Sequence, residues 1–395
     1  MAEQSHRPQA RRVILKLSGV GLAALLAAGC QIIPGGGQRA EQAPPPEPQR
    51  EEAVPIPAAD IRQKVAVLVP LTGPNAGVGT SIANAAALAL ADTRADNILL
   101  TVYDTGKGAT AAAGQAIGDG NRLFLGPLLA EDARTIAPLA RQANIPVISF
   151  SNDVSVAGDG VYIMGFTPSQ SIDRVVSHAR SQGAQRFAGL IPQGDYGARS
   201  LQALTRAVER SGGRLAGTQT FDRTPASLRS AVIRLNAQSA YDAVLIADNP
   251  RIATSAAATI RSGPSNGARI LGTELWRGDT ALTAAATMRG AWFAAAPEAK
   301  FDQLRTRYRA RYGKTPYRLG SLGYDAVLLT VRVAREWRLG RPFPEAELRS
   351  DEGFSGVDGA FRFGRDGVAA RQLEVVQVNA GGFATVSPAP TGFGR

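Results

Sequence analysis

Short apolar runs recur from residue 65 onward, and segments with helical spacing separate them. The runs cover residues 65–69, 99–103, 123–125, 147–150, 187–191, 243–247, 270–271 and 291–295. The first run is apolar at every position, which is typical of a strand buried on both faces. The pattern therefore predicts strands of parallel sheets, with helices between them.

The segments between the runs contain helix signals. Residues 81–91 are rich in Ala and Leu, and residues 133–143 place apolar side chains on one face. The clearest start is Thr167, which we place at the N-cap, with Pro168 in the first helical position and Gln170 completing a capping box. Apolar positions at i, i+3, i+4 and i+7 follow and predict an amphipathic helix.

Strands and helices alternate over about 330 residues, which exceeds the size at which one hydrophobic core keeps growing. This alternation predicts an α/β protein with doubly wound parallel sheets. Residues 64–165 supply one set of strand–helix units and residues 168–295 supply a second. Further helices at 301–312 and 321–337 and strands near 360–363 and 373–378 follow. We therefore expect two doubly wound parallel-sheet lobes.

Residues 1–29 have the layout of a secretory signal peptide. Basic residues precede an apolar stretch at 17–28, which is too short to span a bilayer because spanning needs about 20 residues. Small residues end this stretch, and Cys30, the only cysteine of the chain, follows them. Residues 26–30 resemble a bacterial lipobox, which implies cleavage before Cys30 and lipidation of its thiol. An ordinary signal peptide with an incidental cysteine is the alternative.

Residues 30–63 are expected to form the lipidated N-terminus and a disordered linker rich in Pro and Gly, because they offer little to bury. Acyl chains on Cys30 would anchor the chain to a membrane. By resemblance to lipoprotein sorting rules, Gln31 favours the outer membrane, with the folded part facing the periplasm. An inner-membrane anchor is the alternative, and the choice between Sec and twin-arginine export stays open.

Charge and motif content exclude several functional classes. The net charge is +11, or +8 without residues 1–29, and no basic patch is interleaved with aromatic residues, so we expect no nucleic-acid partner. Two histidines, His6 and His178, and a single cysteine cannot build a metal site rich in these residues. Nucleophile, phosphate-loop and dinucleotide motifs are absent from the sequence. We therefore expect a protein that is not an enzyme and needs no metal or cofactor.

Candidate ligand-binding residues follow the apolar runs, because ligands of open parallel sheets bind outside the carboxyl ends of the strands. In the first lobe they are Thr72, Gly73, Asn75, Ser151 and Asn152. Small polar groups at helix N-termini suit a carboxylate or another anion. In the second lobe they are Tyr196, Glu274 and Trp276, which suit a cation, a sugar ring or an apolar group. The alternative is that these residues only form turns and caps.

Four segments resemble the type I periplasmic binding fold, in the class that binds leucine, isoleucine and valine. They are residues 65–73, 144–151, 195–197 and 271–274. The resemblance implies multiple crossovers between the lobes, with 64–167 and 298–358 in lobe 1 and 168–297 and 359–390 in lobe 2. It also implies that Glu274 holds the amine of an amino-acid ligand.

A narrower resemblance links residues 150–158 and 164–168 to the lipoprotein activators of penicillin-binding proteins, which share this fold. It implies a regulator of peptidoglycan synthesis whose partner is a penicillin-binding protein. The alternative is a substrate-binding lipoprotein that delivers branched-chain amino acids to an ABC importer. Whether an amino acid or another small ligand occupies the cleft stays open.

Overall fold

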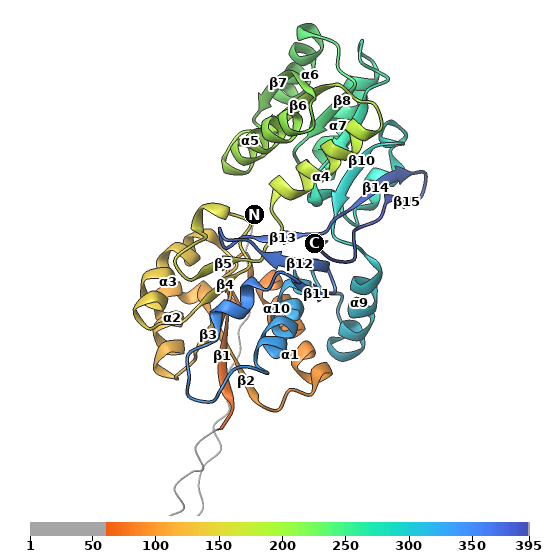
Figure 1. Ribbon diagram of the computed structural model, residues 1–395. Coiled ribbons are helices and arrows are strands. Elements are labelled where there is room, and N and C mark those ends of the chain that lie inside the picture. The colour runs from red at the N-terminus through yellow and green to blue at the C-terminus, as the bar shows by residue number, and fades with distance from the viewer. Residues whose placement is uncertain (1–60, 394–395) are drawn as a thin grey trace, which may run out of the picture. The chain divides into compact units, whose positions relative to one another are not determined.

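The computed structural model describes residues 61–393. The predicted signal peptide, Cys30 and the predicted linker up to residue 60 lie outside these residues, and the linker ends earlier than the predicted residue 63, because Gln63 is buried and begins the first strand. The described chain forms two α/β lobes, each built on its own sheet, and a small third sheet (Figure 1). This arrangement confirms the expected α/β fold with doubly wound lobes.

Lobe 1 is built on the parallel sheet β2-β1-β3-β4-β5. Its strands are β1 (Gln63–Val69), β2 (Ile98–Asp104), β3 (Leu123–Leu125), β4 (Val147–Ser149) and β5 (Val161–Ile163). Its helices are α1 (Ala76–Thr93), α2 (Ala109–Gly118), α3 (Ala130–Gln142), α9 (Ala299–Tyr312) and α10 (Gly320–Val333), with the 3-10 turns η1 (Thr105–Lys107), η2 (Val154–Val156) and η5 (Glu345–Arg349). An antiparallel sheet of β11 (Phe354–Gly356), β12 (Gly359–Phe363) and β13 (Ala369–Arg371) packs against the same lobe.

Alternate residues of β1 face two separate cores, which explains why this strand is apolar throughout. Val65, Val67 and Val69 pack with α1, α9 and α10. Ala66 and Leu68 point the other way and pack with α2 and α3. Helices therefore cover both faces of the sheet, and each fully buried valine or leucine contributes roughly 1.5–3 kcal/mol to stability.

Lobe 2 is built on the sheet β15-β14-β10-β9-β8-β6-β7, in which β14 and β15 run antiparallel and the other strands are parallel. Its strands are β6 (Arg186–Pro192), β7 (Arg214–Phe221), β8 (Ala243–Ile246), β9 (Arg269–Gly272), β10 (Trp292–Ala295), β14 (Glu374–Asn379) and β15 (Gly382–Ser387). Its helices are α4 (Pro168–Ser181), α5 (Asp195–Arg210), α6 (Pro225–Gln238), α7 (Pro250–Arg261) and α8 (Thr280–Ala284), with η3 (Glu274–Trp276) and η4 (Ala286–Met288). Helices α4 and α5 cover one face of the sheet, and α6, α7 and α8 cover the other.

The chain passes between the lobes near residues 164–168, 296–299 and 371–374. The return to lobe 2 that the sequence suggested at residue 359 is too early, because β12 and β13 stay with lobe 1. Phe361 belongs to the core of lobe 1, and the ring of Phe363 packs edge-on against Tyr162 at 5.2 Å. These aromatic contacts hold the small sheet in place, so lobe 2 resumes only at β14.

The first crossing confirms one sequence signal and corrects another. Thr167 is the N-cap of α4 and Pro168 lies in its first turn, as predicted. The capping box does not form, because the amide of Gln170 is bonded elsewhere. It donates to the carbonyl of Ala369 at 2.7 Å and accepts the N–H of Arg371 at 2.8 Å. Gln170 therefore ties the beginning of α4 to β13.

Candidate functional site

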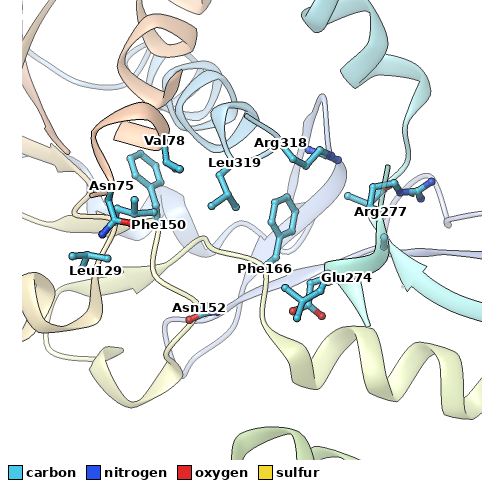
Figure 2. Close-up of a pocket in the computed structure, with 14 residues that line it drawn as sticks. Asn75, Val78, Leu129, Phe150, Asn152, Phe166, Glu274, Arg277, Arg318 and Leu319 are labelled. Atoms are coloured by element: carbon cyan, nitrogen blue, oxygen red, sulfur yellow. Dashed lines mark hydrogen bonds between the residues drawn. The ribbon is translucent and has the colours of Figure 1, made fainter. Parts of the chain in front are cut away.

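A cavity of about 440 Å³ is lined by residues of both lobes, at the carboxyl ends of their parallel strands (Figure 2). Most of its lining is apolar. The apolar residues are Val78, Leu128, Leu129, Phe150, Phe166, Leu275, Ala295, Ala296 and Leu319, and the polar ones are Asn75, Asn152, Glu274, Arg277 and Arg318. A cavity of this size and composition suits a small organic ligand. We refer to it as the cleft cavity.

Two amide side chains provide the polar groups of the cleft cavity that follow β1 and β4. Asn75 is the N-cap of α1, but its side chain makes no capping hydrogen bond, so its amide can serve a ligand. Asn152 follows β4 and is exposed at the cavity. Figure 2 shows Asn75 across the cavity from Arg277. The structure thus brings two of the five residues proposed in lobe 1 to the cavity.

The other residues proposed in lobe 1 do not line the cavity. Thr72 is exposed, and its hydroxyl donates to Oδ2 of Asp104 at 2.9 Å. Gly73, with φ of +78°, lies in the turn that leads into α1. Ser151 is 3% exposed, and its hydroxyl oxygen accepts the N–H of Asp153 at 3.0 Å. These residues stabilise the turns and loops in which they lie, as turn residues commonly do.

Glu274 supplies the carboxylate of the cleft cavity. The phenol oxygen of Tyr196 lies 3.0 Å from Oε1 of Glu274 and 3.0 Å from Oγ1 of Thr273. The second carboxylate oxygen, Oε2, is buried and has no hydrogen-bond partner within residues 61–393. Burial raises the pKa of Glu274 to about 7, although the hydrogen bond from Tyr196 acts in the opposite direction. This carboxylate can therefore accept a hydrogen bond from a ligand, and it is partly protonated at neutral pH.

Trp276 is not part of the cavity, contrary to the sequence-based expectation. Its side chain is fully buried in the core of lobe 2, where Nε1 donates to the carbonyl of Asp248 at 2.8 Å. The indole covers Gly272, where any Cβ would overlap the ring. The turn η3 instead brings Leu275 to the cavity, and this side chain is 43% exposed.

Two arginines that line the cavity, Arg277 and Arg318, carry no motif that marks them in the sequence. Arg277 forms an ion pair with Glu374. Nη1 of Arg318 lies 2.6 Å from the carboxylate of Asp358, which is fully buried. Figure 2 shows both guanidinium groups turned away from Asn75. Both charges are therefore paired within the protein.

The arrangement is suited to binding a small ligand. Two amides, one partly protonated carboxylate and an apolar wall can hold a molecule with an apolar body and a hydrogen-bonding end. In the described part of the chain, no group of three or more His, Cys, Asp or Glu side chains is placed to hold a metal ion. Among the helices of residues 61–393, none has both the length and the apolar character needed to cross a bilayer.

Solved structures of known proteins share this fold over more than four-fifths of the chain. The leucine binding protein LivK from Thermotoga maritima superposes with a TM-score of 0.62 at 20% identity, covering 82% of this chain and 98% of that one. A putative branched-chain amino acid ABC transporter from Rhodospirillum rubrum superposes with a TM-score of 0.72 at 18% identity, covering 82% of this chain and 100% of that one. The C-domain of LpoA from Haemophilus influenzae, a regulator of PBP1A, superposes with a TM-score of 0.64 at 20% identity, covering 82% of this chain and 100% of that one. At these identities the likeness shows the fold alone.

The sequence comparisons add a relative and a family. The uncharacterized protein RP748 of Rickettsia prowazekii is 25% identical over 171 residues, which cover 43% of this chain and 46% of that protein. The match thus spans less than half the length of either protein. Residues 62–383, most of the chain, match the family described as periplasmic binding protein. The chain therefore belongs to the periplasmic binding protein family.

Proposed function

We propose that the protein is a non-enzymatic lipoprotein of the cell envelope that regulates a penicillin-binding peptidoglycan synthase by docking onto it. Membership of the periplasmic binding protein family supports a binding role in the periplasm. Lipidation of Cys30 and a flexible linker, both expected from the sequence, would let the folded part reach a partner from the membrane.

One observation favours docking over amino-acid delivery, namely the hydrogen bonding of Thr72 and Ser151. The α-carboxylate of an amino acid needs hydrogen-bond donors, and these two hydroxyls were among the lobe 1 groups proposed from the sequence to hold such an anion. Thr72 donates to Asp104, and Ser151 is buried and accepts the N–H of Asp153. Neither lines the cleft cavity. A carboxylate that enters the cleft cavity would therefore depend on the neutral amides of Asn75 and Asn152, because the charges of Arg277 and Arg318 are paired within the protein.

The resemblance to the lipoprotein activators supports the same proposal. It lies in residues 150–158 and 164–168, which include the cavity residues Asn152 and Phe166. The LpoA C-domain, which shares the fold, is named as a regulator of PBP1A.

A second candidate function is a substrate-binding protein of an amino-acid importer, and Glu274 is the observation that favours it. Its Oε2 is buried without a hydrogen-bond partner among the described residues. An ammonium group in the cavity could donate a hydrogen bond to this oxygen and form an ion pair with the carboxylate. LivK and the Rhodospirillum rubrum protein, whose names refer to leucine and to branched-chain amino acids, share the fold.

One protein preparation can distinguish the two candidates. The full-length protein in detergent is mixed with the bifunctional penicillin-binding protein of the same organism, and glycan polymerisation and cross-linking are measured. We expect the rate to change at least about twofold, and we expect calorimetry with the standard amino acids to show no binding tighter than about 1 mM, which corresponds to roughly 4 kcal/mol.

A triple variant of side chains that line the cleft cavity, Asn75→Ala, Asn152→Ala and Glu274→Ala, provides the control. It should retain the effect on the synthase, because docking does not depend on these side chains as ligand contacts. Micromolar binding of an amino acid by the wild type, lost in the triple variant and accompanied by no effect on the synthase, would establish the importer function instead.

A further inference from the structure

A second cavity lies in lobe 2, in a groove between α6 and α7, which we call the α6/α7 groove. Its volume is about 450 Å³. Its lining consists of Arg223, Pro225, Leu228, Arg229, Asn249, Arg251, Ile252, Ser255 and Thr259. Three of these residues are arginines and none is acidic. None of them lines the cleft cavity, so the α6/α7 groove is a separate feature of the surface.

The α6/α7 groove carries positive charge that the protein does not neutralise. Nε of Arg223 lies 2.8 Å from Oδ2 of Asp248, a buried carboxylate, and this arginine is paired. Arg229 and Arg251 are exposed, and neither forms an ion pair with another residue of the range 61–393. Guanidinium groups bind carboxylates through paired hydrogen bonds in a fixed geometry. The groove therefore offers two cations to an anionic partner.

The floor of the α6/α7 groove is apolar, which narrows the kind of anion that fits. Leu228 is 3% exposed and belongs to the core beneath α6. Ile252 is half-buried and packs against the same core. Further along α6, Ile233 is 57% exposed, one helical turn from Arg229. An inorganic anion would use only the arginines, whereas a peptide can bring carboxylates and apolar side chains together.

We propose that the α6/α7 groove binds an acidic amphipathic segment of a partner protein. Its carboxylates would pair with Arg229 and Arg251, and an apolar side chain would lie over Leu228 and Ile252. The choice of a protein as the partner rests on the proposed docking function, whereas the charge and the apolar floor stand independently of it. Complementary charge of this kind speeds association and selects the partner.

The experiment uses a fluorescent peptide of about 12 residues with glutamates on one helical face and leucines on the other. Fluorescence anisotropy measures its binding to the full-length protein in a neutral detergent at low salt. Arg229→Glu combined with Arg251→Glu should weaken binding at least about tenfold. The matched control is Arg206→Glu with Arg214→Glu, because these lobe 2 arginines are also exposed and the change in net charge is the same. The control should weaken binding less than about twofold, since distant surface charges are screened.

Three outcomes would overturn the proposal. The first is no binding of the peptide by the wild type, and the second is equal weakening in both double variants, which indicates unspecific attraction. The third is binding of phosphatidylglycerol vesicles or purified peptidoglycan through Arg229 and Arg251 without binding of the peptide. If the peptide binds as expected and the protein has no effect on the synthase, the groove assignment stands and the proposed function fails.

Discussion

The carboxylate of Asp153 in lobe 1 and the guanidinium of Arg199 in lobe 2 form an ion pair between the lobes, with 3.4 Å between Oδ2 and Nη1. The same oxygen lies 2.8 Å from Nη2 of Arg134, which belongs to lobe 1. Burial opposes ionisation of Asp153, but hydrogen bonds from Ser155 and the charges of both arginines bring its pKa below the ordinary value. The ionised carboxylate therefore holds one cation from each lobe.

We predict that Arg199→Ala loosens the arrangement of the lobes and that Arg134→Ala does not. A partly exposed ion pair contributes about 0.2–1 kcal/mol, which corresponds to a rise of up to roughly fivefold in the population of open states. The radius of gyration from small-angle X-ray scattering at pH 7 measures this effect. Because the pKa of Asp153 is lowered in the folded state, the contribution is present at neutral pH and is lost as the pH falls below about 4. Identical scattering from both variants would show that this pair does not hold the lobes.

The raised pKa of Glu274 leads us to predict that the stability of the protein depends on pH. Its pKa is about 7 in the folded protein and lies near 4.5 in an unfolded chain, so the folded state binds more protons between these values. The free energy of unfolding should therefore fall as the pH rises from about 4.5 to about 7, by up to about 3 kcal/mol for this group. In Glu274→Gln this contribution is absent, and urea unfolding at several pH values measures the difference between the two curves.

Tyr196→Phe provides a control on the same carboxylate. It removes a hydrogen bond that stabilises the ionised form, so the pKa of Glu274 should rise. The pH range over which the free energy of unfolding falls should therefore move upward. A downward movement, or a curve for Glu274→Gln that matches the wild type, would contradict the assignment.

Gly197 explains why the segment 195–197 has to contain a glycine. It lies in the first turn of α5, and a Cβ at this position would overlap the carbonyl oxygen of Pro192. Gly197→Ala must therefore move the beginning of α5, which carries Tyr196, and should lower the free energy of unfolding by about 2 kcal/mol or more. The matched control is Gly114→Ala in α2, where a Cβ meets no atom within 4 Å.

The control substitution Gly114→Ala should raise the free energy of unfolding instead of lowering it. Alanine in an open helical position stabilises by about 0.5–1 kcal/mol relative to glycine. Thermal unfolding followed by circular dichroism measures both variants, and a neutral effect of Gly197→Ala would show that α5 adjusts without cost.

Strands with a continuous apolar run of several residues could be predicted from the sequence, and some very short strands or strands with many polar residues could not. The run 65–69 is continuous because both faces of β1 meet helices. β5 has only three residues, and its pattern Val-Tyr-Ile is too short to separate from a loop. β7 lies at the sheet edge, is mostly half-buried and contains Thr and Gln, so it lacks a strong apolar signal.

The candidate site shows the same limit for side chains. Asn75 and Glu274 could be proposed because loops after parallel strands gather at one edge. The prediction that Trp276 binds a ligand was wrong, because the turn η3 directs this side chain into the core of lobe 2. Glu274 and Leu275, which precede it in the same turn, line the cavity instead. Arg318 could not be found, because its partner Asp358 lies 40 positions further along the chain and only the tertiary fold brings them together.

Lobe 1 contains two buried carboxylates, Asp325 and Asp358, close to the buried Arg371 and the partly exposed Arg318. Asp358 is fully buried, 2.6 Å from Arg318, and Asp325 accepts the N–H groups of Val357 at 2.7 Å and of Asp358. Burial and the negative charge of Asp358 raise the pKa of Asp325 to about 7, while Arg371 acts to lower it. Each carboxylate therefore depends on the arginines for compensation.

Asp358→Asn should lower the free energy of unfolding by about 3 kcal/mol at pH 7, because it leaves buried arginine charge with less compensation. The matched control is Asp159→Asn, since Asp159 is 79% exposed and pairs with Arg141 at the surface. That change should have an effect of less than about 0.5 kcal/mol. Urea unfolding compares the two variants. Loss of the neighbouring charge should also lower the pKa of Asp325, so the fall in stability between about pH 4 and pH 7 becomes smaller. Equal effects of the two substitutions would show that the buried cluster contributes no more than a surface pair.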